Sequence, residues 1–123
     1  MTDKRTILCI DDDQDILDIL KAILAANGYE VVGALSAEQG LRAFKQSRPD
    51  LIIVDLMMEE IDAGTNLVKQ LKAAGSEAPI YMLSSVGDSL SMLTDYGELG
   101  LSGIFQKPID SDKILSTIRA KLG

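Results

Sequence analysis

The chain has 123 residues, of which 46% are apolar and 25% are charged, and its formal net charge at pH 7 is −7. This length and composition predict one globular domain with a single core, spanning residues 1–123. The negative charge argues against direct binding to nucleic acid, and no apolar stretch approaches the roughly 20 residues that cross a bilayer.

The residue inventory excludes further classes of site. The chain contains no histidine, which excludes imidazole catalysis, most zinc sites and a phosphohistidine donor. The single cysteine, Cys9, lies in an apolar run and cannot form an internal disulfide. We interpret it as a buried structural thiol, and we expect a cytoplasmic protein, because the first residues also lack the apolar segment of a signal peptide.

The first predicted strand is Thr6–Ile10, whose continuous apolar run is typical of a strand buried on both faces of a parallel sheet. A predicted helix follows, with Asp13 as its preferred N-terminal cap and Asn27-Gly28 as its end. Its expected core-facing stripe consists of Ile16, Ile19, Leu20, Ile23 and Leu24.

The same alternation of strand and helix then repeats. The other predicted strands are Glu30–Ala34, Asp50–Asp55, Ile80–Ser84 and Gly103–Gln106. Ser36 and Gln39 have the spacing of a capping box at the start of the second helix, and Asp110 or Ser111 is expected to cap the fifth. The expected inward residues of the later helices are Leu41 and Phe44, then Leu67, Val68 and Leu71, then Leu90, Leu93 and Leu99, then Ile114, Leu115, Ile118 and Leu122.

Strands that alternate with helices of this length predict a doubly wound α/β sandwich with right-handed crossovers. In such sheets, ligands bind beyond the carboxyl ends of the strands. The polar residues at those ends are Asp11, Asp12 and Asp13 after the first strand, Asp55 at the third, Ser84 at the fourth and Lys107 after the fifth.

A parallel sheet would bring these groups to one edge. Clustered carboxylates repel one another, and a divalent cation with oxygen ligands would relieve that repulsion, so the pattern predicts a Mg²⁺ site. Lys107 adds a fixed positive charge and Ser84 a hydrogen-bond donor, a set suited to a phosphoryl group in transfer. Asp55 is then the candidate nucleophile, because carboxylates form phosphoryl intermediates.

Four motifs together resemble the receiver domain of two-component response regulators, over essentially the whole chain: Ile10-Asp11-Asp12-Asp13, Asp50 to Met58, Met82-Leu83-Ser84-Ser85 and Lys107-Pro108. The resemblance implies a flavodoxin-like fold with a five-stranded parallel sheet in the order 2-1-3-4-5 and five helices. A chemotaxis receiver is a known example of that strand order, so the order comes from the resemblance and not from the pattern of residues.

The resemblance also implies roles for residues. Asp55 matches the phosphoacceptor, Asp12 the direct Mg²⁺ ligand and Asp11 the ligand that acts through water. Met57 matches the residue whose backbone carbonyl binds the metal. Ser84 and Lys107 match residues that contact the phosphoryl group. Pro108 matches a proline that usually follows a cis peptide bond.

For activity and partners, the resemblance implies phosphotransfer to Asp55 catalysed by the domain itself, with autodephosphorylation, rather than turnover of a metabolite. The donor would be a histidine kinase or a histidine phosphotransfer protein. The output would be a downstream protein or a linked domain, with no direct nucleic-acid or membrane contact. A phosphorylation-dependent homodimer is a further partner that the resemblance allows.

Three departures from the family pattern concern the loop after the acceptor and the output region. Glu59 stands where the family has proline, and Gly64 comes one residue late, which predicts a longer, more acidic loop. Ile104 replaces the aromatic residue that acts as a rotamer switch, and the adjacent Phe105 faces the other side of the strand. Because the segment from Val86 to Ser102 is rich in poor helix formers, we expect its reordering to carry the signal.

Three other functions compete with this interpretation. Asp11 and Asp13 also fit the nucleophile and acid/base of haloacid-dehalogenase-type phosphatases, but that interpretation leaves Asp55 unexplained and finds no acidic end to the fifth strand. The complete acidic pocket argues against a pseudo-receiver that only binds proteins. A flavodoxin-like cofactor binder would need a phosphate-binding loop rich in Ser, Thr and Gly after the first strand, and none is present.

Overall fold

The computed structural model describes residues 4–56, 63–85 and 100–122. Five strands form one parallel sheet in the order β2-β1-β3-β4-β5, as predicted. The strands are β1 (Thr6–Ile10), β2 (Glu30–Ala34), β3 (Leu51–Asp55), β4 (Ile80–Ser84) and β5 (Gly103–Gln106).

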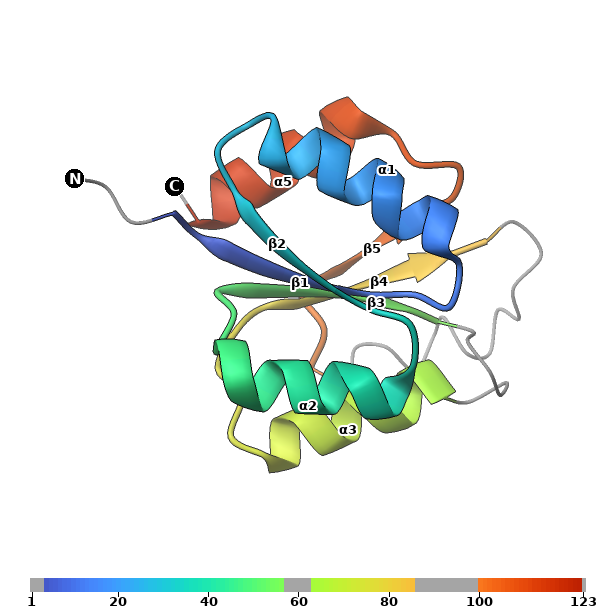
Figure 1. Cartoon of the computed structure of the whole chain (residues 1–123), viewed down its shortest axis with the longest axis vertical. Coiled ribbons are helices and arrows are strands. Elements are labelled where there is room, and N and C mark those ends of the chain that lie inside the picture. The colour runs from blue at the N-terminus through green and yellow to red at the C-terminus, as the bar shows by residue number, and fades with distance from the viewer. Residues whose placement is uncertain (1–3, 57–62, 86–99, 123) are drawn as a thin grey trace.

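Four helices in the described ranges cover the sheet in two layers. They are α1 (Gln14–Ala25), α2 (Ala37–Ser47), α3 (Ala63–Ala73) and α5 (Ser111–Leu122). Helices α1 and α5 lie on one face and α2 and α3 on the other, so the molecule is a three-layer sandwich (Figure 1). The fourth helix expected around Leu90, Leu93 and Leu99, and the expected reordering from Val86, fall outside the described residues.

The core has two halves because the side chains of a strand alternate between its faces. Leu8, Ile52 and Val54 pack with α2 and α3, whereas Ile7 and Ile53 pack with α1 and α5. The three central strands β1, β3 and β4 are almost fully buried, which explains why their sequences are continuously apolar rather than alternating.

Helix boundaries follow local side-chain chemistry. Asp13 caps α1 by accepting a hydrogen bond from the Asp15 backbone N–H, and Ser36 caps α2 by accepting one from the Gln39 N–H. Asp110 accepts from the Lys113 N–H at 3.2 Å, so Asp110 is the cap of α5 among the two candidates. At the end of α1, Gly28 has φ +90°, the left-handed conformation expected of a helix stop.

Two sequence predictions are wrong in detail. Ile19 is 44% exposed, and Leu17 takes its place in the buried stripe with Leu20 and Leu24. Positions 17, 20 and 24 share one side of a 3.6-residue helix, while position 19 lies more than a quarter turn away from it. Strand β3 begins at Leu51 rather than at Asp50.

Asp50 is drawn out of the strand by hydrogen bonds to the start of β1. Its backbone N–H donates to the Thr6 carbonyl, and its Oδ2 accepts from the Thr6 N–H, both at 2.8 Å. The polar side chain at the start of this apolar run therefore aligns the two strands rather than extending one of them.

Candidate functional site

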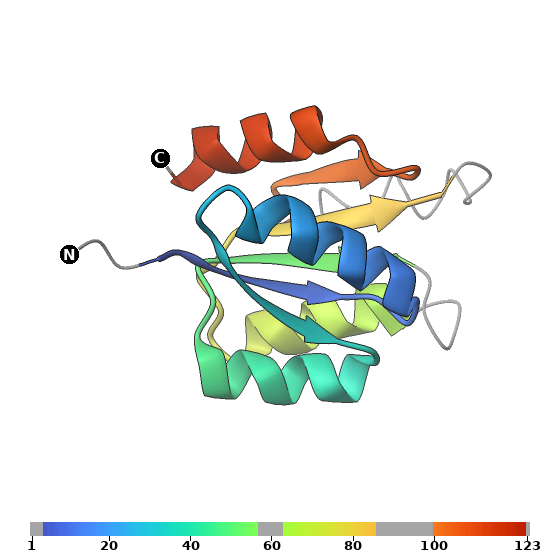
Figure 2. The same ribbon diagram turned by 45° about the horizontal axis from the view of Figure 1, so that its top comes forward.

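The three acidic residues of the predicted site come together at the carboxyl edge of the sheet, toward which all five strands point (Figure 2). One carboxylate oxygen from each of Asp11, Asp12 and Asp55 lies within 4.8 Å of the others. Asp11 is fully buried and Asp55 is 5% exposed, whereas Asp12 is exposed. The adjacency of β1 and β3 in the sheet order produces this convergence.

Backbone contacts hold the first of these carboxylates in place. The Asp11 N–H donates to the Ala34 carbonyl at 3.0 Å, which continues the β1–β2 pairing. Asp11 Oδ1 accepts from the Asp13 N–H at 2.9 Å, and Asp13 Oδ1 accepts from the Asp15 N–H at 2.9 Å. The first of these two consecutive turns is not among the predicted features, although the side chain of aspartate commonly accepts a hydrogen bond from the N–H two residues further along the chain.

Lys107 brings a positive charge to both buried carboxylates. Its Nζ lies 3.2 Å from Asp11 Oδ2 and 3.4 Å from Asp55 Oδ1. The Lys107 backbone N–H donates to the Ser84 carbonyl at 2.7 Å, which extends the β4–β5 pairing and places the lysine beside the end of β4. The peptide bond between Lys107 and Pro108 is cis, as the family resemblance implied.

Burial and charge act in opposite directions on the lysine. Burial alone would lower the pKa of the Lys107 ammonium, but the carboxylates of Asp55 and Asp11 favour its charged form and leave the pKa raised above 10.5. Lys107 therefore stays protonated at neutral pH.

The donor set fits a small divalent cation. Asp11 Oδ2 is buried and has no hydrogen bond of good geometry from any described residue, and its neighbour is the Lys107 ammonium. Three carboxylates against one ammonium leave the site with two excess negative charges. Mg²⁺ is commonly bound by one or two carboxylates while it keeps several waters, so these residues could hold it with an open position for a phosphoryl oxygen.

Ser84 stands at the end of β4, between the strands that carry Asp55 and Lys107, and it is 1% exposed. Its Oγ lies 3.5 Å from the Ser85 carbonyl oxygen, a long contact. A hydroxyl at this place can donate to an oxygen bound at the edge of the sheet. Met57, the remaining predicted site residue, lies outside the described residues.

The two residues before Gln106 separate as strand parity predicted. Ile104 packs on the α2–α3 side of the sheet, and Phe105 is buried on the α1–α5 side. The Phe105 ring stacks on Tyr81 with centroids 5.1 Å apart and an interplanar angle of 17°. Phe105 is therefore part of the core opposite the Ile104 side and does not replace the missing aromatic residue.

A family model described as the response regulator receiver domain matches residues 7–119. This chain belongs to that family. The receiver fold carries the acidic edge just described, and the sheet order 2-1-3-4-5 is the flavodoxin-like order expected for it. The chain is thus a receiver domain of the kind found in two-component signalling.

Relatives of two sizes resemble this receiver domain. It is 34% identical over 117 residues to the chemotaxis protein CheY of Bacillus subtilis, covering 94% of this chain and 96% of CheY. It is 35% identical over 119 residues to the probable transcriptional regulator ycf27 of Porphyridium aerugineum, covering 97% of this chain and 48% of that protein. The chain thus spans about half the length of the ycf27 relatives.

Solved structures agree with the fold. A CheY-like receiver domain protein from Methanospirillum hungatei has a TM-score of 0.89 and 28% identity, covering 98% of this chain and 94% of the other. The chemotaxis protein CheY4 of Vibrio cholerae has a TM-score of 0.86 and 26% identity, covering 96% and 98%. Among the described residues, no helix combines the length and hydrophobicity that a membrane crossing requires.

Proposed function

We propose that this receiver domain accepts a phosphoryl group on Asp55 from the phosphohistidine of a histidine kinase or a histidine phosphotransfer protein. The observation that supports the proposal is the convergence of three carboxylates and one ammonium at the carboxyl edge of the sheet. One oxygen of Asp55 attacks the phosphorus atom while the phosphorus–nitrogen bond of the donor breaks. The electron pair of that bond stays on the donor imidazole, and Asp55 becomes an acyl phosphate.

The residues around Asp55 have separate tasks in this proposal. Lys107 neutralises oxygen charge on the phosphoryl group, and Ser84 donates a hydrogen bond to it. Asp11 and Asp12, with the backbone carbonyl of Met57, would hold Mg²⁺ beside Asp55. The ion supplies positive charge that offsets the charge on the transferring group.

The two metal-site aspartates are expected to differ. Asp12 is exposed, so an ion can reach its carboxylate from solvent, whereas Asp11 is held by the Asp13 N–H and by Lys107. We therefore assign direct ligation to Asp12 and ligation through water to Asp11. Magnesium titration followed by NMR should show a greater loss of affinity in Asp12→Ala than in Asp11→Ala, and identical curves for Asp12→Ala and the wild type would refute the assignment.

The proposal also covers signal output and location. Phosphorylation would change a surface read by a downstream protein or by a linked domain, in a cytoplasmic protein, and a phosphorylation-dependent homodimer is one form that this output could take. Sedimentation of the protein with and without a beryllofluoride mimic of the phosphoryl group tests the dimer: a mass that stays monomeric would eliminate it.

The structure gives the phosphatase alternative little support. Asp13, its acid/base, is committed to capping α1 through the Asp15 N–H. Asp11, its nucleophile, is fully buried with Oδ1 bonded to the Asp13 N–H. The phosphatase alternative also assigns no role to Asp55, which lies at the end of β3.

A further inference from the structure

A short connection carries two of the site aspartates and leads directly into a helix. Strand β1 ends at Ile10 and α1 begins at Gln14, so only three residues connect them. The proposed function uses two of these residues, Asp11 and Asp12, and leaves Asp13 as the cap of α1. Asp13 also contacts the site directly through its backbone.

The polar groups of Asp13 bond in two directions. Its N–H donates to Asp11 Oδ1 at 2.9 Å, on the side of the site. On the side of the helix, its Oδ1 accepts from the Asp15 N–H at 2.9 Å and its carbonyl accepts from the Leu17 N–H at 3.2 Å. One residue thus joins a fully buried carboxylate of the site to the first turn of α1.

Helix α1 is a firm anchor for this link. Leu17, Leu20 and Leu24 are buried in the core on the α1–α5 side of the sheet. The two bonds from Asp13 to the helix hold its backbone extended, with φ −98° and ψ 110°. Because φ sets the direction of the N–H of a residue relative to its own side chain and carbonyl, the cap bond also sets where the donor to Asp11 points.

We propose that Asp13 is a positioning residue of the metal site. Its bond to the Asp15 N–H holds the donor that orients the Asp11 carboxylate, and it fixes one end of the connection in which Asp12 lies. This inference rests on the proposed binding of Mg²⁺ by Asp11 and Asp12, and Asp13 is not itself a ligand. Without the cap, both carboxylates would sample several orientations, which the strict octahedral geometry of Mg²⁺ tolerates poorly.

The cap bond, and not the negative charge, gives Asp13 this role. Asp13 is exposed, so water and salt screen the attraction between its charge and a cation in the site. Asparagine caps helices about as well as aspartate, because its side-chain oxygen also accepts from the N–H groups of the first turn. Asp13→Asn therefore removes the charge and keeps the cap, whereas Asp13→Ala removes both.

Mg²⁺ titration of the whole ¹⁵N-labelled protein, followed by NMR, tests the proposal. Removal of a hydrogen-bond partner of a metal ligand typically costs about 10–100-fold in affinity, but Asp13→Ala keeps the N–H and loses only its fixed direction. We therefore expect Asp13→Ala to weaken Mg²⁺ binding about fivefold, the factor equivalent to a typical N-cap, and Asp13→Asn to weaken it less than about twofold.

The outcomes of this titration are distinct. Equal affinity in wild type and Asp13→Ala would overturn the positioning role and leave the metal site intact. An Asp13→Asn variant as weak as Asp13→Ala would overturn it in favour of a charge effect. A wild type that binds no Mg²⁺ would refute the metal site, and the positioning role with it.

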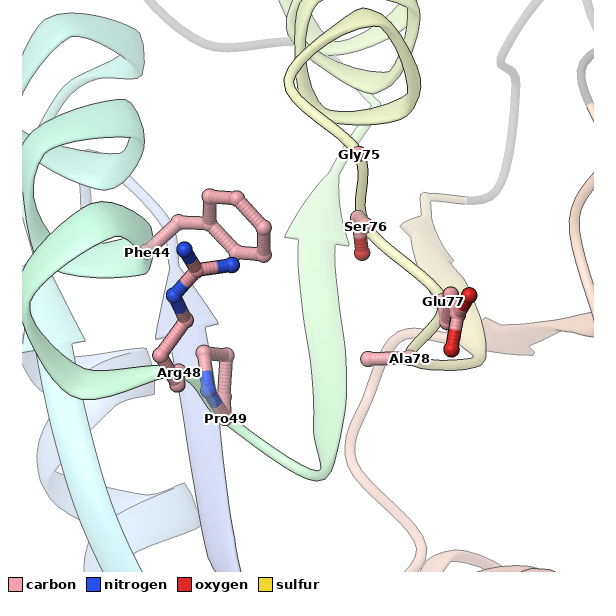
Figure 3. Close-up of a pocket in the computed structure, with 7 residues that line it drawn as sticks. All are labelled: Phe44, Arg48, Pro49, Gly75, Ser76, Glu77 and Ala78. Atoms are coloured by element: carbon pink, nitrogen blue, oxygen red, sulfur yellow. The ribbon is translucent and has the colours of Figure 1, made fainter.

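Two controls separate positioning from a general loss of stability. Ser36→Ala removes the matching cap of α2, a 3.1 Å bond from the Gln39 N–H, and Ser36 is not part of the acidic cluster. Gly75 follows α3 at the opposite edge of the sheet, beside the pocket in Figure 3, and has φ +92°, which strains any residue with a side chain. Ser36→Ala and Gly75→Ala should unfold at lower urea concentration and keep the Mg²⁺ affinity of the wild type. A fivefold loss of affinity in either control would overturn the proposal.

Coupling between the cap and the metal acts in both directions. If the cap strengthens Mg²⁺ binding, Mg²⁺ must strengthen the cap by a similar factor, so saturating Mg²⁺ should slow hydrogen exchange of the Asp15 N–H. The Gln39 N–H, which bonds the cap of α2, is the internal control and should exchange at the same rate with and without Mg²⁺. An Asp15 N–H that exchanges equally fast in EDTA and in Mg²⁺ would contradict the link between the cap and the site.

Discussion

Asp55→Asn should stabilise the metal-free protein. The substitution removes one negative charge and keeps the shape of the side chain. At an effective dielectric constant of about 20, the pair between Asp55 and Lys107 at 3.4 Å corresponds to an attraction of about 5 kcal/mol. On the same scale, repulsion from Asp11 and Asp12, each within 4.8 Å, corresponds to about 3.5 kcal/mol apiece.

The repulsion therefore exceeds the attraction, but solvent screens the share of Asp12, which is exposed. Relief of the desolvation of the buried Asp55 carboxylate adds to the gain. We expect the free energy of unfolding to rise by about 1–2 kcal/mol in Asp55→Asn, an order-of-magnitude figure for a coupled charge cluster.

Urea denaturation followed by circular dichroism measures this change, in buffer with EDTA and again with excess Mg²⁺. Mg²⁺ is expected to bind the folded wild type and not Asp55→Asn or the unfolded chains. Excess Mg²⁺ should therefore reduce or reverse the difference in the free energy of unfolding between wild type and Asp55→Asn. The control is Asp50→Asn, because Asp50 faces Arg5 at 3.8 Å, accepts the Thr6 N–H and lies outside the carboxylate cluster. That variant should be neutral or less stable. If Asp55→Asn in EDTA instead lowers the free energy of unfolding by about 1 kcal/mol or more, the attraction of Lys107 dominates and the reasoning is wrong. About 1 kcal/mol is the typical net contribution of one hydrogen bond.

Three further predictions concern groups around the site. The pKa of Lys107 is raised, so the stabilising contribution of its charge is present at neutral pH and is lost as the pH rises above 10.5 and through the folded-state value. The stability difference between wild type and Lys107→Gln should therefore persist from neutral pH to pH 10 and shrink in strong alkali; a difference that vanishes near pH 8 would contradict this. Cys9 is fully buried, and burial together with the negative charge of Asp11 raises the pKa of its thiol to about 12. Ellman's reagent should therefore label Cys9 only after the protein unfolds, and rapid labelling of the native protein would disprove its structural role. In Gly40→Ala the new Cβ would lie 2.6 Å from Ile10 Cδ1, so we expect urea unfolding to show a net decrease of about 1 kcal/mol in the free energy of unfolding, despite the better helix propensity of alanine. Adding Ile10→Val should recover part of this stability, whereas a Gly40→Ala variant more stable than the wild type would contradict the steric explanation.

Much of the fold follows from the sequence because its central strands are buried on both faces. Four of the five strand ranges agree with the prediction residue for residue, since apolar runs bounded by polar residues mark both ends. The start of the third strand was predicted one residue too early, at Asp50. The side chain and backbone of Asp50 form hydrogen bonds with Thr6, which is 44 residues away in the sequence, and no local pattern reveals this contact. Ile19 is misplaced because a helix with isoleucine or leucine at many positions offers more than one apolar stripe.

The acidic edge of the site is also predictable, because parallel topology alone brings the strand ends together. The pairing of Lys107 with both buried carboxylates needs coordinates, since it depends on where the chain turns after β5.

The most direct test of the central claim is the location of the phosphoryl group. The protein is incubated with acetyl phosphate and Mg²⁺, the acyl phosphate is trapped by borohydride reduction, and the modified residue is mapped by mass spectrometry. The account predicts a single modified position, Asp55, with no trapped product in Asp55→Asn or when EDTA removes the metal. Label on Asp11 would contradict it and favour the phosphatase interpretation.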